Sequence, residues 1–192
     1  MPHYRKLIGT KCYLSPPSPE DAELWANWDN DLEVAIPLGD EAYLSLSLES
    51  EQNHLAEDLR LQRPIFSIVD LANDQVIGRC VLFAIDQLNR RAMLGIVIGE
   101  KSYWSRGYGQ DALRLLLDYG FNLLNLNAVS LGVFTFNERA IQAYRKVGFR
   151  DVGLQRQARI IAGRKYDVLL MDILAEEFDA GGIAGLLDEM GG

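Results

Sequence analysis

The fold is decided by residues 95–149, GIVIGEKSYWSRGYGQDALRLLLDYGFNLLNLNAVSLGVFTFNERAIQAYRKVGF. An apolar run at residues 93–98 is followed by a glycine-rich turn, an amphipathic helix, an apolar strand and a second helix. This order predicts a strand, loop, helix, strand and helix. It places backbone N–H groups that have no partner within their helix next to the turn. An anionic group could bind there, because the helix dipole adds partial positive charge at that end.

The turn has the sequence Arg106-Gly107-Tyr108-Gly109. Gly107 and Gly109 lack a Cβ atom, so the chain can turn tightly and a ligand can approach the backbone. Arg106 could add a charge-assisted hydrogen bond to a phosphate. Taken alone, however, the Gly-x-Gly pattern is explained equally well as a simple turn before a helix.

The second helix has well-defined predicted ends. Asn137 is a favourable N-cap, and Gly148 stands where a left-handed C-cap residue is expected. Apolar residues between them recur at helical spacing, and Tyr144 is one of them. Spacing alone favours Tyr144 as a core aromatic residue rather than a functional one.

Two motifs carry a resemblance to a known family. Residues 104–112, WSRGYGQDA, resemble the acyl-CoA pyrophosphate loop of the GNAT N-acetyltransferase superfamily. Residues 137–149, NERAIQAYRKVGF, are similar to the second motif of that family, at a fitting distance along the chain. Trp104, which replaces the usual Gln or Arg, points to the RimJ/RimL-like branch. The resemblance covers roughly residues 8 to 178 and is strong over 93–149.

The resemblance implies a fold of the α/β (α+β) class. The GNAT fold has a central mixed, mostly antiparallel sheet of about seven strands flanked by about four helices. Its sheet is splayed at the acyl-CoA site. We expect a single acetyltransferase domain at residues 1–178, followed by a Gly-rich acidic tail at residues 179–192 with a short helix.

The resemblance also implies a cofactor site. The pantetheine arm of acetyl-CoA would lie between strands at residues 93–99 and 129–136 and pair with the backbone at Val97 and Gly99. An N–H near Ile98 or Gly99 could polarise the thioester oxygen. Asn137 would contact the cofactor arm. Arg139 or Lys146 would meet the outer phosphate, or else face solvent. The pyrophosphate would accept hydrogen bonds from the backbone N–H groups of Arg106, Gly107, Tyr108, Gly109 and Gln110.

For catalysis, the resemblance makes Tyr144 the general acid that protonates the leaving thiolate. Glu100 is either a general base acting through a water molecule or an ordinary surface carboxylate. The expected function is acetyl transfer from acetyl-CoA directly to a primary amine. The acceptor would be a small molecule or a protein N-terminus, and a ribosomal-protein-type acceptor fits the branch. The alternative is a non-catalytic acyl-CoA-binding or regulatory protein on the same fold.

A dinucleotide-binding fingerprint offers a competing interpretation, because Gly107-x-Gly109-x-x-Ala112 matches its glycine spacing. Three features count against it. Residues 100–106 separate the strand from the first glycine, and the next strand does not end in an acidic residue. The chain also opens and closes with predicted hairpins rather than βαβ units.

Composition excludes several other classes. The chain has 192 residues, 48% hydrophobic and 24% charged, as expected for one globular domain. A net charge of −8 argues against a nucleic-acid binder. No apolar run approaches the roughly 18 residues of a membrane span. We expect a cytoplasmic protein that could form a homodimer. Cys12 and Cys80 are expected to be buried or free thiols, and with His3 and His54 they form no familiar metal-binding spacing, so we expect no metal.

The remaining chain is predicted from apolar patterns and turn signals. We expect a strand at 7–14, a helix beginning at Ser18, a loop at 29–43, a helix at 48–61 and hairpins at 65–83 and 154–174. Arg79 is expected to face solvent. In the family, the first two helices and the loop between them line the acceptor side. Carboxylates of that loop could attract an amine or be solvated charges: Asp29, Asp31, Glu33, Asp40 and Glu41.

Overall fold

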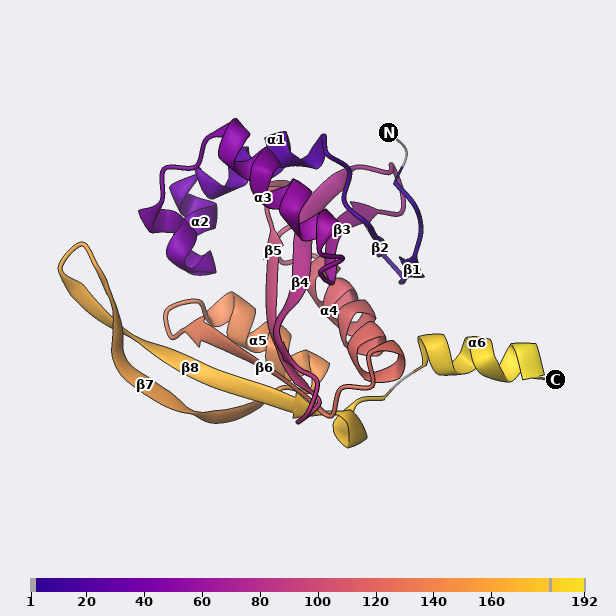
Figure 1. Ribbon diagram of the computed structural model, residues 1–192. Coiled ribbons are helices and arrows are strands. Elements are labelled where there is room, and N and C mark those ends of the chain that lie inside the picture. The colour runs from indigo at the N-terminus through magenta and orange to yellow at the C-terminus, as the bar shows by residue number, and fades with distance from the viewer. Residues whose placement is uncertain (1–2, 180, 192) are drawn as a thin grey trace.

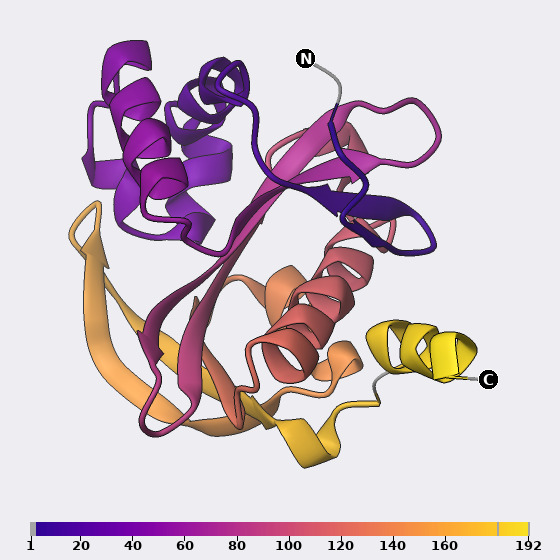
Figure 2. The same ribbon diagram turned by 45° about the vertical axis from the view of Figure 1, so that its right-hand side comes forward.

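The computed structural model describes residues 3–179 and 181–191, in which a single mixed sheet carries helices on both faces (Figures 1 and 2). Its eight strands follow the order β1-β2-β3-β4-β5-β6-β8-β7. The strands are β1 (Leu7–Ile8), β2 (Cys12–Ser15), β3 (Ile65–Asp70), β4 (Val76–Asp86), β5 (Arg91–Ile98), β6 (Ala128–Phe134), β7 (Arg150–Ile161) and β8 (Arg164–Leu174). Among the strands that the structure describes, only β5 and β6 pair in parallel. The mixed, mostly antiparallel sheet is therefore confirmed, with one more strand than expected.

Six α-helices and several short helical turns are described, against about four helices expected from the fold family. The α-helices are α1 (Asp21–Asp29), α2 (Leu32–Leu38), α3 (Leu48–Arg60), α4 (Tyr108–Asp118), α5 (Glu138–Val147) and α6 (Gly182–Gly191). The 3-10 turns are η1 (Asp40–Tyr43), η2 (Lys101–Tyr103) and η4 (Ala175–Glu177), and η3 (Tyr119–Leu123) is a π-helical turn at the end of α4. None of the described helices is long and apolar enough to cross a bilayer.

Two hydrophobic clusters form the core within residues 3–179 and 181–191, one on each face of the sheet. Leu113, Leu116 and Leu117 of α4 pack with Leu94 of β5 in the larger cluster. Trp25 and Trp28 of α1, Val34 of α2 and Leu55 of α3 pack with Val97 of β5 in the smaller one. Because successive strand residues point to opposite faces, Leu94 and Val97 serve different clusters. Cys12 and Cys80 are buried and unbridged, as expected.

The sheet divides where β5 meets β6. The two strands pair only at their beginnings, from Arg91↔Ala128 to Met93↔Ser130. Beyond Met93 and Ser130 they diverge, although each strand continues, and Figure 1 shows the opening between them. The structure thus has the splay that the fold class implied.

Several predictions for the N-terminal third were wrong. The strand expected at 7–14 is a hairpin of β1 and β2, because the backbone turns at Gly9, Thr10 and Lys11. The loop expected at 29–43 contains α2 and η1, even though Pro37 lies inside α2. Pro37 lies one residue before the end of α2, so its missing N–H removes a single intrahelical hydrogen bond. The helix expected from Ser18 begins at Asp21.

The prediction that Arg79 faces solvent was also wrong. Its side chain is only 16% exposed, and one guanidinium nitrogen lies 2.8 Å from both carboxylate oxygens of Asp29. A second nitrogen lies 3.3 Å from Glu51 of α3. Helices α1 and α3 cover this part of β4, so the charge that the strand pattern placed in solvent is buried in an ion-pair cluster. Asp29 is correspondingly a buried partner of Arg79 and not a solvated loop charge.

Candidate active site

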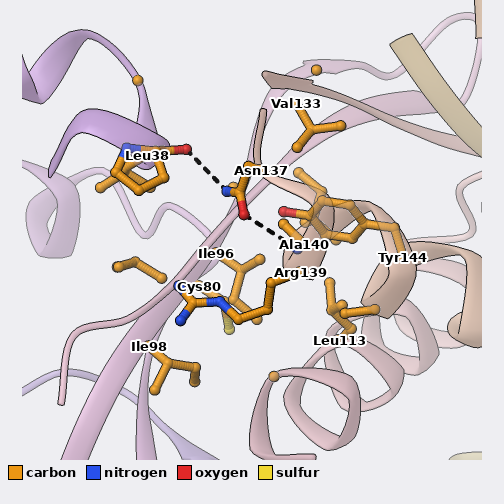
Figure 3. A pocket seen from close by; sticks show the side chains of 18 of the residues that line it. Leu38, Cys80, Ile96, Ile98, Leu113, Val133, Asn137, Arg139, Ala140 and Tyr144 are labelled. Atoms are coloured by element: carbon orange, nitrogen blue, oxygen red, sulfur yellow. Dashed lines mark hydrogen bonds between the residues drawn. The ribbon is translucent and has the colours of Figure 1, made fainter. Parts of the chain in front are cut away.

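The opening between β5 and β6 continues into a large cleft of about 920 Å³. Its walls come from β4, β5, β6, the N-terminal end of α4, and α5. Segment α2–η1 and strands β7 and β8 line its other end. In Figure 3, Asn137, the N-cap of α5, and Tyr144 of α5 lie on one side of the cleft, and the Arg139 side chain extends from α5 over Ile96 and Cys80 of β5 and β4.

The backbone of β5 faces the cleft at alternate residues. The N–H of Gly99 donates to the carbonyl of Ile77, at 2.9 Å, so it is engaged on the β4 side. Hydrogen-bonding direction alternates along an antiparallel strand, which leaves the N–H groups of Ile96 and Ile98 facing β6. The Ile98 carbonyl accepts a 2.6 Å hydrogen bond from the Trp104 indole. Two backbone N–H groups were proposed to polarise a thioester. That of Ile98 faces the opening, whereas that of Gly99 already donates to the Ile77 carbonyl of β4.

The glycine-rich turn forms the N-terminus of α4. Gly107 is the N-cap residue and has a left-handed conformation, with φ of +89°. Gly109, by contrast, has room for a Cβ, which would stand 3.8 Å from the Ile98 side chain. Gly107 is thus required by the backbone itself. The absence of a side chain at Gly109 keeps the adjacent part of the cleft open.

Two tyrosines hold this turn from behind. The hydroxyls of Tyr108 and Tyr103 each donate to Asp70 of β3, at 3.1 Å, and the two rings pack edge to face. Burial and the hydrogen bond to Asp70 raise the pKa of Tyr108. Because the side chain of Tyr108 is directed toward β3, only its backbone N–H is available to a ligand at the helix end.

Helix α5 carries Asn137 and Tyr144. The Asn137 side chain caps the helix by accepting the Ala140 N–H at 3.2 Å and donates to the Pro37 carbonyl of α2 at 3.4 Å (Figure 3). Tyr144 is half-buried against Phe149, and its hydroxyl points into the cleft toward Asn137 (Figure 3). Burial raises the pKa of Tyr144 to about 12. The phenol is therefore protonated at neutral pH and can donate its proton.

Arg139 extends from α5 across the cleft. Its guanidinium lies 3.8 Å from the centre of the Trp104 ring, and burial lowers its pKa. A cation held this close to an aromatic face is attracted by the ring. The arrangement joins α5 to the loop after β5, across the space between the splayed strands.

The structure brings together most, but not all, of the predicted site residues. Those that line the cleft are Val97, Ile98, Gly107, Tyr108, Gly109, Gln110, Asn137 and Tyr144. Gly99, Glu100 and Arg106 do not line it. The Glu100 carboxylate accepts a 3.1 Å hydrogen bond from the Trp28 indole, and Arg106 donates to the Ser102 carbonyl at 3.1 Å.

The other end of the cleft contains residues that sequence reasoning missed. Arg159 of β7 forms an ion pair with Asp40 of η1 at 2.8 Å, and Tyr43 donates to the Ile160 carbonyl at 3.2 Å. These contacts connect the tip of the β7–β8 hairpin to η1, and Asp40, Glu41 and Arg159 line the cleft there. Asp31 and Glu33 are instead both paired with Lys101. No local pattern in β7 could have identified Arg159, because its partner is more than 100 residues away in the chain.

The family model described as acetyltransferase (GNAT) domain matches residues 11–150. This match spans the splayed strands, the glycine-rich turn and α5. The chain therefore belongs to the GNAT acetyltransferase family, and it is an acyltransferase of the N-acetyltransferase kind.

Individual relatives agree with this class. N-acetyltransferase p20 of Bacillus licheniformis is 32% identical over 161 residues, which cover 83% of this chain and 90% of that protein. Spermidine N(1)-acetyltransferase of Vibrio cholerae is 31% identical over 111 residues, 58% of this chain and 64% of that enzyme. The crystal structure of the spermidine N-acetyltransferase from Vibrio cholerae in complex with CoA and spermine superposes with a TM-score of 0.79 at 25% identity, covering 86% of this chain and 96% of that one.

Proposed function

We propose that this protein uses acetyl-CoA to acetylate a primary amine of a small molecule or of a protein N-terminus. The observation that carries the proposal is the Tyr144 hydroxyl, protonated and directed into the cleft between the splayed strands β5 and β6. The crystal structure of the spermidine N-acetyltransferase from Vibrio cholerae, which has the same fold, is a complex with CoA and spermine. This complex supports acyl-CoA use by the present chain.

The cleft has features that fit each part of acyl-CoA. Phosphates fit the N-terminus of α4, where the N–H groups of Tyr108, Gly109 and Gln110 have no partner within the helix. An extended pantetheine arm fits beside β5, because the Ile96 and Ile98 backbone groups face the opening. Val97 contributes its buried side chain to the supporting core instead of a backbone contact. Asn137, which lines the cleft at the start of α5, would contact the same arm.

Acetyl-CoA supplies an activated acetyl group and a thiolate leaving group. The Ile98 N–H, which faces the opening, would stabilise negative charge on the carbonyl oxygen as the amine attacks. Tyr144 donates its proton to the departing thiolate. The protein holds amine and thioester together, and this positioning supplies much of the rate without a covalent intermediate.

Removal of the amine proton is assigned to water. Glu100 is hydrogen-bonded to Trp28 and does not line the cleft, so a role as base requires a water relay around the end of β5. The amine proton can leave to solvent at the open end of the cleft, or before binding.

The acceptor is proposed from the relatives and from the branch. The spermidine acetyltransferases make spermidine the first amine to test. Trp104, which donates a hydrogen bond to the Ile98 carbonyl and packs against the Arg139 guanidinium, supports a RimJ/RimL-like assignment. The matching acceptor for that branch is an N-terminal peptide of ribosomal-protein type.

The homodimer stays a prediction. Light scattering of the purified protein checks it.

Calorimetric titration with acetyl-CoA, with NAD as the control ligand, tests the proposal. We expect micromolar acetyl-CoA binding and none of NAD, followed by thiol release when spermidine or an N-terminal peptide is added. Binding without thiol release for any amine of a broad panel would favour a non-catalytic acyl-CoA-binding protein. NAD binding, or binding of neither ligand, would overturn the proposal.

A further inference from the structure

The turn between β1 and β2 is clamped to the first turn of α4. One carboxylate oxygen of Asp111 accepts the Thr10 N–H at 3.1 Å and the Thr10 hydroxyl at 2.9 Å. The other accepts the Lys11 N–H at 2.8 Å and the Cys12 N–H at 3.0 Å. A Cβ on Gly9 would stand 2.4 Å from this carboxylate, so only glycine fits there. Four hydrogen bonds to one ionised group hold the turn at a fixed position beside the glycine-rich loop.

This clamp places the side chain of Lys11 on the loop itself. The Cε atom of Lys11 lies 3.2 Å from the position that a Cβ on Gly107 would take, and its ammonium lies 5.7 Å from the centre of the Tyr108 ring. Lys11 is exposed and makes no ion pair with any carboxylate among residues 3–179 and 181–191. An unpaired ammonium thus lies next to Gly107 and Tyr108, two residues that line the cleft, although Lys11 does not line it itself.

The charge of the whole chain gives this placement a consequence. At a net charge of −8 the protein repels a polyanionic ligand at long range. The neighbouring cations are committed elsewhere, because Arg106 donates to Ser102 and Arg139 is stacked on Trp104. Lys11 adds a charged end from the turn between β1 and β2, and Lys146 of α5 adds another among the residues that line the cleft.

We infer that Lys11 is an additional cofactor-binding residue, whose ammonium binds a phosphate of the nucleotide portion of acyl-CoA, and that Asp111 is its positioning residue. The inference rests on the proposed function and adds a contact from the N-terminal hairpin. The phosphate is either the pyrophosphate or the 3′-phosphate, and the two are distinguished by comparing CoA with 3′-dephospho-CoA.

Calorimetry with CoA on the wild type and on Lys11→Met tests the inference. We expect the dissociation constant to rise about tenfold or more, as for loss of a hydrogen bond to a charged group. Lys11→Arg should retain most of the affinity, and added salt should weaken binding to the wild type more than to Lys11→Met. Lys6→Met, on an exposed lysine of the same segment, is the matched control and should bind as the wild type does.

Titration with 3′-dephospho-CoA identifies which phosphate of CoA Lys11 contacts. If 3′-dephospho-CoA binds the wild type and Lys11→Met equally, Lys11 contacts the 3′-phosphate. If its affinity falls in Lys11→Met as that of CoA does, Lys11 contacts the pyrophosphate. In Lys11→Met, KM for acetyl-CoA should rise, and the turnover number at saturating acetyl-CoA should stay that of the wild type.

Asp111→Asn tests the positioning role. It should weaken CoA binding while Lys11 is present and have little further effect in the Lys11→Met background, since both changes remove the same contact. Unchanged CoA affinity in Lys11→Met would overturn the inference and leave the proposed function intact. Failure of the wild type to bind CoA would overturn the proposed function itself.

Discussion

At the scale of single residues, burial bears on the general-acid role proposed for Tyr144. Its hydroxyl has to be protonated to serve a thiolate, and burial that raises its pKa to about 12 keeps it so. The same burial disfavours the phenolate, so the residue is poorly suited to act as a base. Tyr144 is therefore in its protonated form at neutral pH, which is the form that a proton donor requires.

Tyr144→Phe should therefore lower turnover by about 100-fold or more, with acetyl-CoA affinity nearly unchanged. In the wild type, activity should not fall from loss of the Tyr144 proton until the pH approaches about 12, because a raised pKa preserves the protonated form. Steady-state kinetics against pH and a calorimetric titration of the variant measure both effects. Unchanged turnover in Tyr144→Phe would remove the general-acid role.

The two glycines of the turn should respond differently to alanine. Gly107→Ala forces a Cβ into a left-handed conformation at φ of +89° and should lower the free energy of unfolding by roughly 1–2 kcal/mol. Gly109→Ala meets only an ordinary contact and should leave stability intact while weakening acetyl-CoA binding. Denaturant unfolding and calorimetry on the two variants provide the comparison. Equal losses of stability would contradict it.

At the scale of elements, the Arg79 cluster fastens α1 and α3 to the sheet. Asp29 comes from the end of α1, Glu51 from α3 and Arg79 from the middle of β4. Burial raises the pKa of Glu51, despite the opposing charge of Arg79. The Glu51 charge is thus poorly compensated, whereas both Asp29 oxygens lie close to Arg79.

Arg79→Met should destabilise the protein by about 3–5 kcal/mol, because it leaves two buried carboxylates without their cation. Glu51→Gln should cost much less, since it removes a charge that burial already disfavours. Urea unfolding of both variants at neutral pH measures the difference. A larger loss from Glu51→Gln would show that Glu51 is the principal partner of Arg79.

At the scale of the whole molecule, α6 is an appendage on the body of the domain. Figures 1 and 2 show it beside α4, and none of the described residues of α6 lines the cleft. The Ile183 N–H donates to Asp118 of α4 at 2.9 Å, and Ile183 is the one residue buried within the described part of α6. The exposed side chains of Leu186, Leu187 and Met190 contribute little to docking.

A chain ending at residue 179 should consequently fold and bind acetyl-CoA with unchanged affinity. Its free energy of unfolding should fall by about 2 kcal/mol, which corresponds to loss of the buried Ile183 side chain. Denaturant unfolding and calorimetry check this expectation. The domain boundary predicted at residue 178 would be contradicted by a truncated chain that fails to fold.

Local signals predicted much of the fold and most of the residues that line the cleft among those proposed for the site. Strands β3, β4, β5 and β8 follow apolar runs bounded by turn residues, and α5 is defined by its caps at Asn137 and Gly148. Such signals act within a few residues, through backbone conformation and side-chain periodicity, and they remain legible without tertiary contacts. The order of the glycine-rich turn and α5 was sufficient to indicate the family.

Only the tertiary structure decided which charged residues meet. Arg79 lies under helices that the strand pattern does not reveal, Glu100 is turned to Trp28, and Lys11 reaches Gly107 from almost a hundred residues away. Periodicity assigns a side chain to a face of its own element but not to the element that covers that face. The motifs of the sequence therefore determined the class of the protein, and long-range packing determined which side chains complete its site.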